Sequence, residues 1–141
     1  MIYGATYPSL KGKTVVVSGG GSGIGESIVT HFAEQGAKVG FLDIADEASV
    51  DLETSLNAAG YSAMYVHCDV TDTKTLRNAI GAIRNEYGSI GVLVNNAAHD
   101  QRHKFEDVTP EYWDDRIAIN IKHQFFAAQA VAEDMKSLGG G

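Results

Sequence analysis

A glycine-rich turn between a β-branched run and a helical pattern constrains this chain more than any other feature. Thr14–Ser18 consists of three valines between hydroxyl residues, and the glycines at 19, 23 and 25 follow directly. In such a turn Gly19 permits a tight bend, Gly23 lets a phosphate approach the backbone, and Gly25 lets the helix pack closely on the strand. The spacing is G-x-x-x-G-x-G, and G-x-G-x-x-G does not fit in any register. The turn predicts a dinucleotide-binding site; the alternative is a flexible loop.

Strand and helix patterns alternate along the whole chain. We expect strands at Thr14–Ser18, Lys38–Asp43, Ser62–His67 and Val92–Asn95, and helices at Ile24–Gln35, Asp46–Ala59, from Thr71 or Thr73 to Tyr87, and from Pro110 to about Leu138 with a break near Asn120. Ile24, Ile28 and Phe32 mark the apolar face of the first helix. Repeated β-α units predict one α/β domain over residues 1–141, a Rossmann-like, doubly wound parallel sheet with helices on both faces.

Polar and small residues follow each predicted strand. They are Ser18–Gly25, Asp43, Cys68-Asp69-Val70 and Asn95-Asn96-Ala97-Ala98. Because parallel strands end at the same edge of a sheet, we expect these groups to converge on one ligand site there.

Composition excludes several classes of protein. The 141 residues carry a net charge of −7, which argues against nucleic-acid binding, and no apolar run approaches the length of a membrane span. The single cysteine, Cys68, rules out an internal disulfide and suits a reducing compartment. Met1–Leu10 has neither the basic start nor the apolar centre of a signal peptide. We expect a cytoplasmic protein.

Five motifs together resemble the short-chain dehydrogenase/reductase family. Its T-G-x-x-x-G-I-G turn corresponds to Ser18–Gly25 with serine for threonine, and its N-N-A-G corresponds to Asn95–Ala98 with alanine for the last glycine. Its acidic residue after the second strand corresponds to Asp43, its D-V after the third to Asp69-Val70, and its helix asparagine to Asn120. The resemblance spans essentially the whole chain and implies an NAD-dependent enzyme.

The resemblance also implies a set of cofactor-binding residues. They are Gly19, Ser22, Gly23, Ile24, Gly25, Asp43, Ile44, Asp69, Val70, Asn96, Ala97, Ala98 and Ile119. A carboxylate at Asp43 can accept hydrogen bonds from both adenosine ribose hydroxyls and repels a 2′-phosphate, which favours NAD over NADP. Asp69 is expected at the adenine edge with Val70 on its ring. The alternatives are a solvated carboxylate at Asp43 and a helix cap at Asp69.

The remaining polar residues have weaker assignments. Asn95 is expected to tie the fourth strand to its neighbours, and the resemblance implies that the catalytic residue Asn120 holds a water in a proton relay. Asp100, Arg102 and His103 could bind sugar hydroxyls, although surface solvation explains them equally well. His99, Asp100 and His103 lack a second ligand pair, so we expect no metal site. Trp113, Phe125 and Phe126 read as core or subunit-interface anchors.

Within the family the chain is most similar to NAD-dependent sugar 1-dehydrogenases of the D-xylose, L-arabinose and galactose type. This likeness rests on Tyr7–Lys13, Phe41–Glu47, Asp100–Lys104 and Tyr112-Trp113-Asp114. It implies a monosaccharide substrate and a homo-oligomer, a tetramer or dimer. The alternatives are a 3-oxoacyl reductase, a non-catalytic NAD-binding fragment, and an S-adenosylmethionine-dependent methyltransferase, which would leave Asn95–Ala97 and Asn120 unexplained.

The catalytic serine and the Tyr-x-x-x-Lys pair of the family are missing here. Tyr7 precedes Lys11 by four positions, but the pair lies before the first strand, where neither side chain could reach a nicotinamide. The chain ends where the family's fifth strand would follow, which leaves the fourth strand as an open edge. We expect these residues alone to be inactive. Three explanations fit this end of the chain: an incompletely recorded longer enzyme, a deliberate fragment, or a short gene product. We favour the first.

Overall fold

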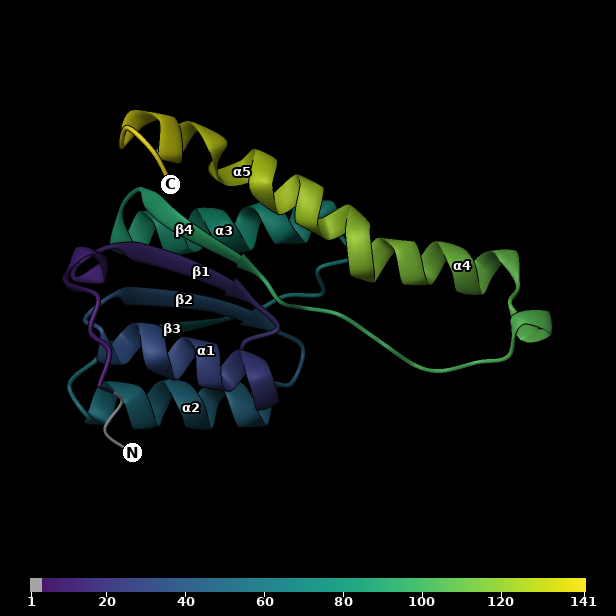
Figure 1. Cartoon of the computed structure of the whole chain (residues 1–141), viewed down its shortest axis with the longest axis horizontal. Coiled ribbons are helices and arrows are strands. Elements are labelled where there is room, and N and C mark those ends of the chain that lie inside the picture. The colour runs from purple at the N-terminus through teal and green to yellow at the C-terminus, as the bar shows by residue number, and fades with distance from the viewer. Residues whose placement is uncertain (1–3) are drawn as a thin grey trace.

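The computed structural model describes residues 4–141. The first three residues of the Met1–Leu10 segment, in which the sequence shows no signal-peptide features, lie outside this range. Four strands form one parallel sheet in the order β3-β2-β1-β4 (Figure 1). The strands are β1 (Thr14–Ser18), β2 (Lys38–Asp43), β3 (Ser62–His67) and β4 (Ile90–Asn95). Every residue of β1 is buried, as its central place in a sheet covered on both faces requires.

Helices cover both faces of this sheet (Figure 1). Helices α1 (Gly23–Glu34) and α2 (Asp46–Ala58) lie on one face, and α3 (Thr73–Tyr87) and α5 (His123–Ser137) lie on the other. Helix α4 (Pro110–Ile117) extends away from the sheet and joins α5 through a π-helical turn, η3 (Ala118–Lys122). Two short 3-10 turns, η1 (Pro8–Leu10) and η2 (Phe105–Asp107), complete the described elements. The doubly wound α/β fold is confirmed.

The alternating side chains of β1 separate two apolar clusters. Val15 and Val17 face Val29 of α1, whereas Val16 faces the cluster that contains Ile83 of α3 and Ala127 of α5. A side chain at Gly40 would overlap Ile83, so this glycine lets α3 pack against β2. Both clusters are buried, which fixes the register of the sheet.

Two sequence expectations about local structure were wrong. Ile24 does not face the core; it is 77% exposed, and Gly25, Val29 and Ala33 form the buried face of α1. Neither Thr71 nor Thr73 caps α3, because Asp72 accepts the amide hydrogen bonds there. Asp72 has a lowered pKa because Thr75 and Lys74 donate to its carboxylate.

The other boundaries agree with the sequence pattern to within one residue, except that β4 begins at Ile90, two residues before the expected Val92. The Thr109 side chain caps α4 by accepting from Tyr112 N at 3.2 Å, with Pro110 as the first helical residue. The expected break near Asn120 is the π-helical turn. Phe126 packs against the core, while Trp113 and Phe125 are exposed and so are not core anchors. No helix in residues 4–141 is long and apolar enough to cross a membrane.

The order of the strands determines where a ligand can bind. The chain leaves β1 toward β2 and β3 and then returns to the other side of β1 with β4, so the winding reverses between β1 and β4. In open α/β sheets, ligands bind beyond the carboxyl ends of the strands at this switch point.

Candidate functional site

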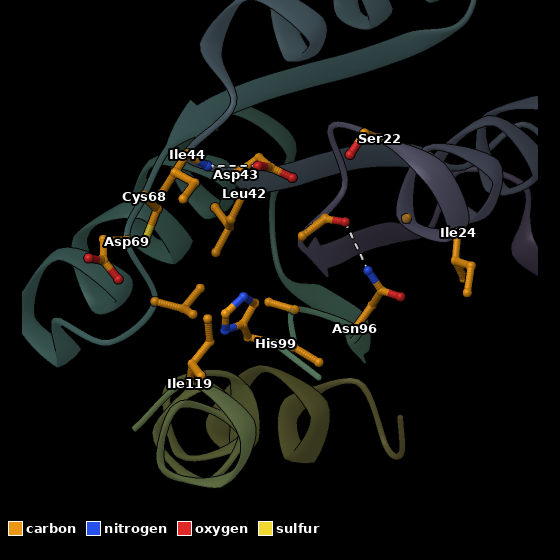
Figure 2. A pocket seen from close by; sticks show the side chains of 15 residues that line it. Ser22, Ile24, Leu42, Asp43, Ile44, Cys68, Asp69, Asn96, His99 and Ile119 are labelled. Atoms are coloured by element: carbon orange, nitrogen blue, oxygen red, sulfur yellow. Dashed lines mark hydrogen bonds between the residues drawn. The ribbon is translucent and has the colours of Figure 1, made fainter. Parts of the chain in front are cut away.

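A cleft of about 410 Å³ opens at the carboxyl ends of all four strands. Its lining residues are Gly19, Ser22, Ile24, Gly25, Leu42, Asp43, Ile44, Cys68, Asp69, Val70, Asn96, Ala97, Ala98, His99 and Ile119. Figure 2 shows Ser22 and Ile24 on one side, Cys68 and Asp69 on the other, and His99 and Ile119 between them. The structure therefore brings together residues from widely separated parts of the sequence.

The glycine-rich turn places the start of α1 against the cleft. Gly19 has φ +66°, and its N–H donates to the Leu42 carbonyl at 2.7 Å. A side chain at Gly25 would overlap the Gly19 carbonyl oxygen and lie 2.8 Å from Asn96 Nδ2. Gly23 has φ +57° and does not line the cleft. The Ser22 side chain makes no capping bond, so the first amides of α1 remain open to an anion.

Backbone amides hold the Asp43 carboxylate in one orientation. Its Oδ1 accepts from Ile44 N at 2.8 Å and Ala45 N at 3.0 Å, and its Oδ2 accepts from Gly21 N at 2.8 Å. A carboxylate has about four acceptor positions, so one on Oδ2 stays open. Gly21 is required here because a side chain would overlap Ser49 and approach Asp43. Asp43 thus joins the glycine turn to the end of β2.

The residues after β3 form the next part of the wall. Asp69 does not cap α3; its Oδ1 accepts from Thr71 N at 2.9 Å and from Thr71 Oγ1 at 2.7 Å, which shapes the loop. Cys68 is 1% exposed, and burial together with the nearby Asp69 and Asp72 carboxylates raises its pKa to about 11. A thiol of this kind is a packing residue, not a nucleophile.

Asn96, rather than Asn95, ties β4 to β1. Its Nδ2 donates to the carbonyls of Ser18 at 3.1 Å and Gly19 at 2.8 Å. Asn95 is exposed and still belongs to the strand, opposite Ser18. Ala98 replaces the family glycine without strain, since no non-glycine residue among residues 4–141 has positive φ. The turn after β4 is therefore held by the side chain one position later than expected.

Asn120 lies in the π-helical turn beside this wall. Its Oδ1 accepts from His99 N at 2.8 Å and its Nδ2 donates to the His99 carbonyl at 3.1 Å. Its own carbonyl accepts from Gln124 Nε2 at 2.8 Å. The side-chain amide thereby fixes the backbone of a residue that lines the cleft.

The three expected substrate residues lie outside the cleft. Asp100, Arg102 and His103 are exposed in the segment between β4 and η2. His103 lines a second cavity of about 900 Å³ along α4, where its Nδ1 lies 2.8 Å from Tyr112 Oη. Asn120 lines this second cavity as well. In residues 4–141 no group of three or more metal-ligating side chains gathers.

Leu42 and His99 line the cleft, although neither was among the cofactor-binding residues expected from the sequence. Leu42 precedes Asp43 and could have been inferred from the convergence of strand ends. His99 follows the N-N-A-A motif, and its place depends on Asn120, which the sequence does not pair with it.

A parallel sheet with a glycine turn, an open helix N-terminus and a fixed carboxylate at the carboxyl ends of its strands is typical of nucleotide-binding α/β proteins. The chain belongs to the short-chain dehydrogenase family, whose model matches residues 13–141. It is 53% identical over 137 residues to D-xylose 1-dehydrogenase of Caulobacter vibrioides, covering 97% of this chain and 54% of that protein. It is 43% identical over 136 residues to a "Probable galactose dehydrogenase" of Rhizobium meliloti, covering 96% and 53%.

Solved structures agree with this assignment. A metagenomic short-chain oxidoreductase in complex with NADP superimposes with TM-score 0.88 at 29% identity, covering 94% of this chain and 61% of that one. A gluconate 5-dehydrogenase from Burkholderia cenocepacia in complex with NADP and tartrate gives 0.83 at 30% identity, covering 93% and 51%. The chain spans about half the length of the curated relatives it matches.

Proposed function

We propose that this chain is the cofactor-binding half of an NAD-dependent dehydrogenase that oxidises a monosaccharide at its anomeric carbon to a lactone. One observation carries the cofactor assignment: the open N-terminus of α1 and the fixed Asp43 carboxylate line the same cleft. A dinucleotide needs a donor set for its pyrophosphate and an acceptor for its adenosine ribose, and the cleft offers both.

The choice of NAD over NADP depends on Asp43. With three backbone N–H groups on the carboxylate, its remaining acceptor position suits a ribose hydroxyl. A 2′-phosphate would bring a second negative charge to the same place, which is unfavourable. The next residues, Ile44, Ala45 and Asp46, supply no cation. The NADP found in two structural relatives makes this preference the point to test.

Each part of the cleft has a proposed role. The backbone of Gly19 and Gly25, with Ser22 and Ile24, receives the pyrophosphate, and Gly23 in the same turn, although outside the cleft lining, lets the pyrophosphate approach the backbone. Asp43 and Ile44 receive the adenosine ribose, and Asp69 and Val70 receive the adenine. Asn96, Ala97, Ala98 and Ile119 receive the inner ribose and nicotinamide. When bound, NAD accepts a hydride from the sugar. The protein's part is to orient both partners and to exclude water.

The substrate side is assigned by chemistry and by the relatives. Asp100, Arg102 and His103 follow the cleft wall and offer the donors and the acceptor that sugar hydroxyls require. Asn120 holds the His99 backbone and is proposed to hold a water of the proton relay. The serine, tyrosine and lysine that the family uses for proton transfer are proposed to lie in a further part of the protein.

We further propose a cytoplasmic homo-oligomer, a tetramer or dimer. Support comes from Trp113, Ile121 and Phe125, which are 60%, 58% and 65% exposed along the segment from α4 to α5. Such exposed apolar side chains on one helical segment are typical of subunit contacts.

The test is oxidation of aldoses by the whole protein. D-xylose, L-arabinose and D-galactose are incubated with NAD, and NADH formation is followed by its absorbance; a 3-oxoacyl thioester with NADPH is the counter-substrate. We expect NADH from at least one aldose. Turnover of the thioester alone would support the reductase alternative, and NADH binding without any turnover would support a non-catalytic nucleotide-binding protein.

A further inference from the structure

His123 is the first residue of α5 and is fully buried, although its ring carries two polar nitrogens. Its Nε2 lies 3.5 Å from Ser18 Oγ, a long contact. Within residues 4–141 its Nδ1 has no partner of standard hydrogen-bond geometry, and the Ile119 carbonyl, one turn before it, interacts with the ring only weakly. Burying an imidazole in this way is unfavourable, so its place in the core requires an explanation. The side chain comes from α5, while Ser18 ends β1 at the start of the glycine turn.

The bonds of Ser18 determine which ring nitrogen of His123 carries hydrogen. Ser18 Oγ accepts from Asn96 N and Ala97 N, each at 3.1 Å, which uses both lone pairs of the hydroxyl. The hydroxyl hydrogen must therefore point elsewhere, and in the described part of the chain the acceptor within reach is His123 Nε2. The ring hydrogen of neutral His123 is then on Nδ1. Burial lowers the pKa of His123, and the Ile119 carbonyl opposes that shift only in part.

The ring thus lies behind two walls of the cleft. Asn96 and Ala97, held by Ser18, form one wall, and Ile119, one turn before His123, belongs to the other. We propose that Ser18 and His123 are positioning residues that set the spacing of these walls for the dinucleotide. This inference rests on the proposed function, because it concerns the same cleft.

The proposal predicts what each substitution does. His123→Phe keeps an aromatic ring but removes the acceptor for the Ser18 hydroxyl. We expect the hydroxyl to rotate toward another acceptor, which weakens the hydrogen bonds that Ser18 Oγ accepts from Asn96 N and Ala97 N. His123→Gln keeps an acceptor oxygen near the position of Nε2. Ser18→Ala leaves both amides without their acceptor. Val131→Ala, further along α5 in the apolar cluster that contains Val16, is the matched control for loss of core packing.

The first measurement needs no cofactor. Nitrogen-15 NMR of the histidine rings in the protein, with His123→Gln to assign the signals, reports the tautomer at pH 7.5. We expect His123 as the Nδ1–H form with unprotonated Nε2. An Nε2–H form, or a mixture of the two, would overturn the hydrogen-bond direction and with it the proposal.

The second measurement is NADH affinity by fluorescence titration. We expect the Kd to rise about 5-fold in Ser18→Ala and in His123→Phe, which corresponds to one hydrogen bond of about 1 kcal/mol. The double variant should be no worse than either single variant, and His123→Gln should restore most of the affinity. Equal effects of His123→Phe and Val131→Ala would overturn the positioning role. A wild-type protein that binds no dinucleotide would refute the proposed function, whereas the NMR result would still decide the Ser18–His123 bond.

Discussion

Replacing Gly25 by alanine should destabilise the protein, while the same change at Gly81 should stabilise it. Both glycines lie in helices, α1 and α3, so both variants gain helix propensity of about 0.5–1 kcal/mol. An alanine Cβ at position 81 would meet no atom within 4 Å, so that gain remains. At position 25 the Cβ would overlap the Gly19 carbonyl oxygen, which is backbone and cannot turn aside.

The magnitude follows from two losses at position 25. Overpacking costs about 1–3 kcal/mol. The Cβ would also lie 2.8 Å from Asn96 Nδ2, whose hydrogen bond to Gly19 O is worth about 1 kcal/mol. After subtracting the gain in propensity, we expect Gly25→Ala to lose about 1–3 kcal/mol, which places it about 2–4 kcal/mol below Gly81→Ala.

Urea denaturation measures this difference. With a slope of about 2 kcal/mol per molar urea, the two midpoints should differ by about 1–2 M at equal slopes. If Gly25→Ala were as stable as Gly81→Ala, α1 would not pack closely on the end of β1, and the glycine turn would not need a glycine at position 25.

Three further outcomes are expected. Asp134 is 13% exposed, and its carboxylate accepts from Arg84 Nε at 2.8 and 3.0 Å. Asp134→Ala should therefore lower the free energy of unfolding by about 2–3 kcal/mol in urea titrations. As a control, Glu133→Ala, which removes the exposed partner of Lys136, should change it by less than about 0.5 kcal/mol. Cys68, with its raised pKa of about 11, should react with a thiol reagent only after urea is added; rapid labelling of the folded protein would contradict its burial. Burial lowers the pKa of His123 below 6.5, so the unfolded chain binds more protons at this residue than the folded chain does. The free energy of unfolding should therefore fall below pH 6.5 by up to about 1.4 kcal/mol per pH unit. His123→Gln should reduce that slope.

Much of the fold could be predicted because glycine stops and apolar runs agree along the chain. Gly36, Gly60 and Gly88 end three helices with positive φ, and the three strands Thr14–Ser18, Lys38–Asp43 and Ser62–His67 have the expected bounds. The buried face of α1 could not be predicted, because Gly25 contacts the strand without a side chain that a hydrophobic pattern can register.

The limits at the site have similar physical causes. Asp72 lies between two threonines, and only the point at which α3 begins decides which of the three caps it. Asn95 and Asn96 are equivalent in sequence, but the strand ends between them, so only Asn96 turns toward β1. The segment that contains Asp100, Arg102 and His103 has no periodic pattern, and its position follows from where α4 extends away from the sheet (Figure 1).

We propose that the cleft binds NAD and that the Asp43 carboxylate selects NAD over NADP. The most direct measurement compares the Kd of NADH and NADPH for the wild-type protein, Asp43→Asn, and Asp46→Asn as a control that removes a neighbouring carboxylate charge. Because a 2′-phosphate beside Asp43 sets like charges together, we expect wild type to prefer NADH by at least about 10-fold. Asp43→Asn should lose most of that preference, and Asp46→Asn should keep it. Equal binding of the two cofactors by wild type would refute selection by Asp43, and no binding of either would refute the dinucleotide site.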